Sequence, residues 1–217
     1  MRYPAPWIMA ITAAALLGTA SAHAQAPKSL QIVPKKGPLA GKALYTNSHA
    51  LLVGIKKYEH LPKQRWLDYA DRDAVDLRNM LVTQYGFREQ NVVVLLNENA
   101  TKARIEVVLS AFADSQKVRE DDRVLVFFSG HGQTVKLPTG GDTGFLIPYD
   151  AKVDLDNPNN AAPYLTTCVR MDALWGYLEA TPAKHSLVIA DACYSGLLTK
   201  TRALERLNVQ ALAALAS

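Results

Sequence analysis

Short, uninterrupted apolar runs alternate along this chain with longer stretches in which apolar residues recur every three or four positions. Four of the runs predict buried β-strands: 50–55, 92–96, 123–128 and 186–190. Amphipathic stretches between them predict three helices: 69–86, 100–115 and 170–182. Strands that are apolar on both faces and alternate with helices form mostly parallel sheets that are covered on both sides. The pattern therefore predicts an α/β fold with three layers.

Individual residues support the helix boundaries. In the first helix an apolar stripe runs from Ala70 to Leu81, and Gly86 is expected to end it. Thr101 is a suitable N-cap for the second helix.

Three segments do not follow this alternation. A short strand is expected within 144–151, and the polar stretch 133–144 has the composition of a surface loop. The last residues, 197–217, favour a helix.

The first residues have the pattern of a secretory signal. An apolar run of 16 residues, 7–22, follows Arg2 and leads into small residues that a signal peptidase reads. We interpret 1–24 as a signal peptide, 25–47 as an extended lead-in and 48–217 as the folded domain. The protein is then exported, periplasmic or secreted, without a stable membrane anchor after cleavage. The alternative is an uncleaved anchor, although the run is shorter than the roughly 20 residues of a membrane span.

Composition narrows the possible partners. The chain has 217 residues and a net charge of +4, and its lysines and arginines are scattered. No long basic block is present, so a nucleic-acid partner is not expected. The chain has two cysteines, Cys168 and Cys193, which allow at most one disulfide and no four-cysteine zinc site. A Cys168–Cys193 disulfide is an alternative that would silence Cys193 as a nucleophile.

Two chemically capable side chains follow predicted strands. His131 comes just after the strand at 123–128, and Cys193 just after the strand at 186–190. Parallel strands bring such ends to one edge of the sheet, where ligands and chemistry gather. Cysteine attacks a carbonyl as thiolate, and a neighbouring imidazole can accept its proton. Gly130 and Gly132 flank His131 and let a substrate backbone approach, and the amides of Gly132 and Cys193 can face an oxyanion.

The segments "FFSGHGQ" and "DACYSG" resemble the His and Cys motifs of caspase-like cysteine peptidases, especially metacaspases. "ALLVGIKKY" and "YADRDAVDL" are similar to that family's first strand and first helix. The resemblance, over about residues 48–200, implies a caspase–haemoglobinase fold and an endopeptidase with His131 and Cys193 as its catalytic dyad. Its partner is then a polypeptide substrate, and we expect a monomer that requires no cofactor.

The same resemblance implies a substrate pocket lined by Asp73 and Asp191, which favours Arg or Lys before the cleaved bond. Asp73 also lies on the apolar edge of its helix, where a carboxylate needs a partner or a task. For Asp73 the alternative is a helix cap or an ion pair. For Asp191 it is hydrogen bonding that shapes the turn.

Two features depart from the family pattern. The chain stops at Ser217, where the family's domain normally continues with further strands, so we expect the domain to be incomplete at its C-terminus. Some metacaspases also need calcium, and four acids are available for it here: Asp142, Asp150, Asp154 and Asp156. They lack the spacing of a calcium-binding hand, so calcium activation is an open alternative.

Other classes fit less well. "GHGQTV" lacks the third glycine of a dinucleotide fingerprint, and an α/β-hydrolase places its histidine after the nucleophile. The histidines show no paired spacing for a metal. The remaining alternative is a catalytically silent caspase-like scaffold or regulatory module.

Overall fold

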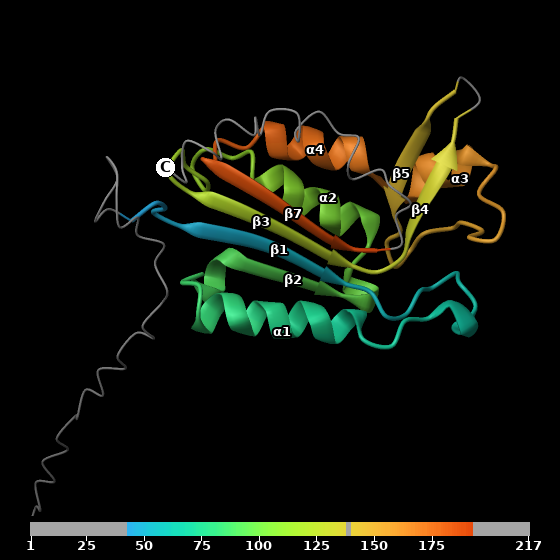
Figure 1. Cartoon of the computed structure of the whole chain (residues 1–217), viewed down its shortest axis with the longest axis horizontal. Coiled ribbons are helices and arrows are strands. Elements are labelled where there is room, and N and C mark those ends of the chain that lie inside the picture. Colours follow the sequence, from blue (N-terminus) through green and yellow to red (C-terminus); the bar gives the residue numbers. More distant parts are fainter. Residues whose placement is uncertain (1–42, 138–139, 193–217) are drawn as a thin grey trace, which may run out of the picture.

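A parallel four-stranded sheet forms the centre of the molecule (Figure 1). The computed structural model describes residues 43–137 and 140–192. The strands lie in the order β2-β1-β3-β7, with these bounds: β1 Ser48–Gly54, β2 Val92–Leu96, β3 Arg123–Ser129 and β7 His185–Asp191. Each strand coincides with one of the four predicted apolar runs.

Helices cover both faces of this sheet. Helix α1 (Ala70–Thr83) lies on one face, and α2 (Lys102–Ala111) and α4 (Met171–Glu179) lie on the other (Figure 1). Thr101 caps α2 as predicted, because its side chain accepts a hydrogen bond from the Arg104 amide. The predicted three-layer α/β architecture is confirmed.

The two faces of β3 show how the core is divided. Leu125 and Phe127 pack with Ala74 of α1, whereas Val126 and Phe128 belong to the larger cluster under α2 and α4. Strand β7 differs from the prediction of a strand buried on both faces. Leu187 is 54% exposed and lies beside Leu125 in register, on the α1 side. Among the described residues α1 packs on β1, β2 and β3, which leaves this face of β7 open.

A second, antiparallel sheet stands at the carboxyl end of the first (Figure 1). It has the order β4-β5-β6, with these bounds: β4 Gly132–Lys136, β5 Asp142–Leu146 and β6 Val169–Arg170. The prediction of a surface loop over 133–144 was therefore wrong for most of its length. Val135 and Phe145 are fully buried, but apolar residues were too sparse along this polar hairpin to show a strand period.

Shorter elements complete the described chain. Helix α3 (Ala161–Thr167) precedes β6, and three helical turns lie in loops: η1 Lys63–Arg65, η2 Glu89–Asn91 and η3 Asn97–Asn99. The sequence did not predict α3 or β6, and it began the helix at 170–182 slightly too early. None of the helices within 43–137 and 140–192 is long and apolar enough to cross a membrane. The predicted signal at 1–24, Cys193 and the predicted helix at 197–217 lie outside the described residues.

Candidate active site

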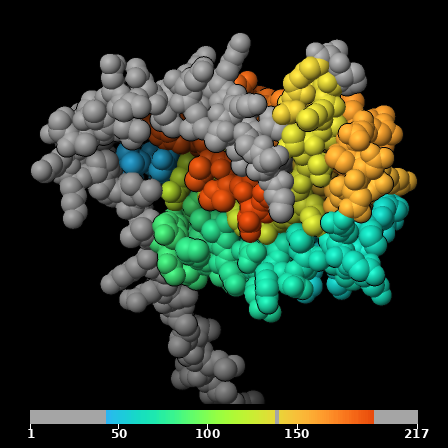
Figure 2. Space-filling view, turned by 45° about the vertical axis from the view of Figure 1, so that its right-hand side comes forward, coloured from blue at the N-terminus to red at the C-terminus, as the bar shows by residue number. Residues whose placement is uncertain are grey.

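The carboxyl ends of β1, β3 and β7 form one edge of the central sheet. Gly54 pairs with Ser129, and Ser129 pairs with Asp191, so these three residues lie side by side across the strands. The Gly130 amide donates to the Asp191 carbonyl at 3.2 Å and continues this pairing one residue further. In Figure 2 the end of β7 reaches the surface between α1, the loop 55–69 and the β4–β5 hairpin.

His131 lies between the two sheets, one residue before β4 begins. Its ring atom Nε2 is 2.5 Å from the Arg65 carbonyl oxygen, and its amide donates to the Tyr58 hydroxyl at 2.7 Å. Its own carbonyl accepts from the Ile147 amide at 3.0 Å. A carbonyl can only accept, so Nε2 carries the proton and Nδ1 is the unprotonated nitrogen of the neutral ring. The geometry thus leaves Nδ1 as the atom that can accept a proton.

The loop 55–69 carries both Tyr58 and Arg65 to His131 and is held at several points. The Asn97 side-chain oxygen accepts from the amides of Lys56 at 2.9 Å and Lys57 at 3.1 Å. The loop closes on itself where the Leu67 amide donates to the Lys56 carbonyl at 2.9 Å. These bonds fix the loop against the end of β2, so the partner of His131 Nε2 is supplied by ordered backbone.

Asp73 approaches the same edge from α1. A Cβ on Gly54 would lie 2.4 Å from the Ala70 carbonyl oxygen, so a glycine is needed for the first turn of α1 to come this close. The Ser129 hydroxyl donates to Asp73 Oδ2 at a long 3.4 Å. Asp73 is half-buried, and this bond points its carboxylate toward the strand ends rather than toward a neighbouring base on its own helix.

Asp191 is the last residue of β7 and is exposed. In-register partners in parallel strands share a face, so its side chain lies on the α1 side with that of Ser129. Asp73 and Asp191 therefore flank Ser129 on one face of the sheet. Cys193 follows Asp191 by two residues and lies outside the described residues.

The glycines around His131 have different roles. A Cβ on Gly130 would meet the Phe128 ring at 2.9 Å and the Tyr58 hydroxyl at 3.0 Å. Packing against these two side chains accounts for a glycine at position 130, and the approach of a substrate stays a prediction. Gly132 opposes Leu146 as a non-hydrogen-bonded pair, because the Ile147 amide bonds to His131. The Gly132 amide hence points away from β5, as an oxyanion donor must.

The Cys168 thiol is buried and unreactive. Cys168 is a free cysteine, 1% exposed, in the core cluster under α4. Burial raises the pKa of the Cys168 thiol to about 12, so almost none of it is thiolate near neutral pH.

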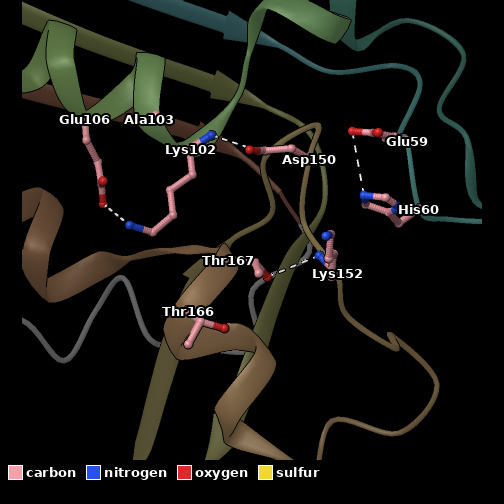
Figure 3. A pocket seen from close by; sticks show the side chains of 9 residues that line it. All are labelled: Glu59, His60, Lys102, Ala103, Glu106, Asp150, Lys152, Thr166 and Thr167. Carbon is pink, nitrogen blue, oxygen red and sulfur yellow. Dashed lines mark hydrogen bonds and ion pairs between the residues drawn. The ribbon is translucent and has the colours of Figure 1, made fainter.

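A polar hollow of about 510 Å³ lies at the start of α2, next to residues 59–60 of the loop (Figure 3). Its charged groups mostly bind one another. Lys102 pairs with Glu106 at 2.5 Å, and Asp150 accepts from the Lys102 amide at 2.9 Å. The hollow contains none of His131, Asp73 and Asp191.

The four acids considered for calcium do not form one cluster. Asp142 lies in β5 opposite Lys136, and Asp150 binds the start of α2. Asp154 accepts from the Asp156 amide at 3.0 Å, and the Asp156 carboxylate forms an ion pair with Arg65. Within the described ranges no three His, Cys, Asp or Glu side chains lie close enough together to hold a metal ion.

A three-layer α/β domain with this strand order, and with a histidine and a cysteine following neighbouring parallel strands, has the architecture of a caspase-like peptidase domain. The family described as the caspase domain, peptidase C14, matches residues 47–211. The chain therefore belongs to the caspase domain family.

Individual relatives agree with this assignment. The chain is 30% identical to metacaspase-4 of Arabidopsis thaliana over 132 residues, which cover 56% of this chain and 28% of that protein. It is 28% identical to metacaspase-1 of Eremothecium gossypii over 163 residues, 69% of this chain and 32% of that protein. The chain thus spans about a third of the length of these relatives.

A solved structure shares the fold. The protein GSU0716 of Geobacter sulfurreducens superposes with a TM-score of 0.51 at 19% identity, covering 75% of this chain and 56% of that one. At this identity the likeness concerns the fold alone.

Three features of the site were missed from the sequence. The Arg65 carbonyl has no side-chain signature, so no motif can indicate it. Ser129 and Tyr58 were both visible, in "FFSGHGQ" and "GIKKY", but a hydroxyl next to a strand end carries no specific signal without its partner.

Proposed function

We propose that this protein is a cysteine endopeptidase in which His131 and Cys193 form the catalytic dyad. One observation carries the proposal: Ser129 and Asp191 are paired across β3 and β7, and each dyad residue follows its paired residue by two positions. Ser129 and Asp191 lie side by side at one edge of the sheet, and this supports a dyad formed by the residues that follow them. The raised pKa of Cys168 supports Cys193 as the reactive thiol.

The protonated Nε2 of His131 defines the proton path. Nδ1 accepts the proton of the Cys193 thiol, and the thiolate sulfur forms a bond to the peptide carbonyl carbon. As the carbon–nitrogen bond breaks, Nδ1–H gives its proton to the leaving amine and a thioester remains. Water, deprotonated by Nδ1, then attacks the thioester and releases the new carboxyl group and the free thiol.

The Gly132 amide, with that of Cys193, is the proposed oxyanion donor. Its orientation away from β5 supports this role. Asp73 and Asp191 are the proposed selectivity residues. Two carboxylates beside Ser129 favour a cationic Arg or Lys side chain and disfavour an acidic one.

Fluorogenic peptides ending in Arg, Lys or Asp before the reporter group test the proposal on the full-length mature protein. We expect hydrolysis after Arg and Lys, none in Cys193→Ala, and nearly unchanged rates in Cys168→Ala, which removes the other thiol. Hydrolysis that survives Cys193→Ala excludes the dyad. If wild type cleaves none of the peptides, with reductant and with or without calcium, the non-catalytic scaffold becomes the better reading.

Export and state of assembly belong to the same proposal. We expect the mature protein to begin at Gln25 after loss of 1–24, to be a monomer and to need no cofactor. Sequencing the N-terminus of protein from the periplasm and medium tests the first point. The rate with and without added calcium tests whether the ion activates the enzyme.

A further inference from the structure

Tyr58 makes two contacts with His131, through different parts of its side chain. Its hydroxyl accepts the His131 amide proton at 2.7 Å. Its ring lies 5.0 Å from the imidazole, centroid to centroid, at an interplanar angle of 34°. Tyr58 is only 2% exposed, so its own position is fixed by the core.

The hydroxyl replaces a bond that the sheet cannot supply. His131 receives the Ile147 amide on its carbonyl, as in a strand pair, but its own amide turns away from β5 and binds Tyr58 instead. The backbone of His131 is thus held on one side by β5 and on the other by Tyr58. The ring is then confined between the Tyr58 ring and the Arg65 carbonyl.

The surroundings keep the Tyr58 hydroxyl in this place. Burial raises the pKa of Tyr58, which keeps the hydroxyl protonated. Gly130 leaves the space that the hydroxyl occupies, since a Cβ there would lie 3.0 Å from it.

We propose that Tyr58 is a positioning residue for the imidazole of His131: its hydroxyl and ring hold His131 so that Nε2 stays on the Arg65 carbonyl and Nδ1 remains the nitrogen that accepts a proton. This inference rests on the proposed function. Tyr58 itself touches no reacting atom and acts through His131.

Tyr58→Phe tests the inference, and Tyr164→Phe is its matched control. Tyr164 is also buried, at 1% exposure, and its hydroxyl also makes one 2.7 Å bond to the backbone, at Asp154. Both variants lose one such bond and should shift the denaturation midpoint similarly. We expect kcat to fall about tenfold in Tyr58→Phe with KM within about twofold, because only the alignment of the base changes. In Tyr164→Phe both constants should stay within about twofold of wild type.

The His131 ring gives a readout that does not need hydrolysis. Nitrogen NMR of histidine-labelled protein, assigned with a His131→Ala variant, should show a proton on Nε2 in wild type and in Tyr164→Phe. In Tyr58→Phe we expect a mixture of the two tautomers. Should no variant cleave peptides, the proposed function fails, but these spectra still decide whether Tyr58 positions the ring.

Identical kinetics and identical His131 signals in Tyr58→Phe and Tyr164→Phe would overturn the inference. If Tyr58→Phe does not fold, Gly130→Ala replaces it, because the added Cβ would crowd the hydroxyl at 3.0 Å, together with the Phe128 ring at 2.9 Å, without removing the hydroxyl. Gly130→Ala must then show the same fall in kcat and the same change in tautomer, and wild-type values for both would refute the role.

Discussion

The two ends of the central sheet hold carboxylates in different ways. At the amino end Asp122, fully buried, accepts from the Asn47 amide at 2.8 Å, the Arg119 amide at 3.0 Å and His49 Nε2 at 3.2 Å. At the carboxyl end Asp73 is half-buried with one long bond from Ser129, and Asp191 is exposed.

This difference separates a carboxylate that stabilises the fold from carboxylates that can bind a ligand. Asp122 ties together the residues that lead into β1 and β3, and its carbonyl accepts from Lys184 just before β7. Its hydrogen-bonding capacity is therefore used inside the protein. Among the residues that the structure describes, Asp73 and Asp191 keep most of theirs, and a cationic side chain can use it.

The largest expected effect is on stability, at the amino end. Asp122→Ala leaves three part-buried hydrogen bonds without their acceptor and should lower the free energy of unfolding by about 3 kcal/mol. Chemical denaturation measures this loss. The neighbouring Asp121 is mostly exposed and pairs with Lys184 at 3.3 Å, so Asp121→Ala should cost less than about 1 kcal/mol. Equal losses of unfolding free energy in Asp122→Ala and Asp121→Ala would contradict the structural role of the buried carboxylate.

The pH dependence of stability tests the role of the Asp122 charge. Burial alone would raise the pKa of Asp122, but the hydrogen bonds from Arg119, His49 and Asn47 outweigh it and lower the pKa below its usual value. A carboxyl with a lowered folded pKa adds stability above its unfolded pKa of about 3.9, and this stability is lost as pH falls through the folded value. The difference in unfolding free energy between wild type and Asp122→Asn should therefore shrink below about pH 4. A difference that stays constant from pH 7 to pH 3 would show that the charge of Asp122 contributes nothing.

The second effect is on selectivity, at the carboxyl end. Asp73→Asn and Asp191→Asn should each lower kcat/KM for an Arg peptide about tenfold, because a charged hydrogen bond contributes about 1.5 kcal/mol more than a neutral contact. A citrulline peptide has nearly the shape of the Arg peptide without the charge, so both substitutions should barely change its kcat/KM. The ratio of kcat/KM for the Arg peptide to that for the citrulline peptide therefore isolates the electrostatic contribution. Asp76→Asn, at an exposed position of α1, is the matched control. If the Arg-to-citrulline ratio is unchanged in both Asp73→Asn and Asp191→Asn, the proposed acidic pocket is refuted, but the proposed dyad is not.

Sequence patterns predicted the central sheet better than the small sheet beside it. The strands β1, β2 and β3 are continuous apolar runs because helices cover both faces, and such runs are visible without any structure. The hairpin β4–β5 is polar along most of its length and has few buried positions, such as Val135 and Phe145. These buried positions pack against residues from elsewhere in the chain, as Phe145 does against Tyr164, and no local pattern encodes such contacts.

The candidate site divides in the same way. His131, Asp73 and Asp191 were predicted by their motifs, and the structure brings them to one edge of the sheet. The Arg65 carbonyl comes from the loop 55–69, which reaches His131 only through tertiary contacts such as Asn97 with Lys56. The sequence alone therefore failed mainly to predict the groups that orient the candidate site residues.

The smallest expected effect is at Ser129, which lies beside both Asp73 and Asp191. Ser129 is 3% exposed, and its hydroxyl donates to Asp73 at 3.4 Å, a long and weak bond. Ser129→Ala leaves Asp73 charged and half-exposed to water, so it should cost little stability. Without the hydroxyl the carboxylate is less well oriented, and KM for an Arg peptide should rise about threefold with kcat unchanged, since Ser129 touches no reacting atom. In the double variant Ser129→Ala/Asp73→Asn, KM should match that of Asp73→Asn alone, because the hydroxyl acts through that carboxylate. Additive effects on KM would instead mean that Ser129 contacts the substrate directly.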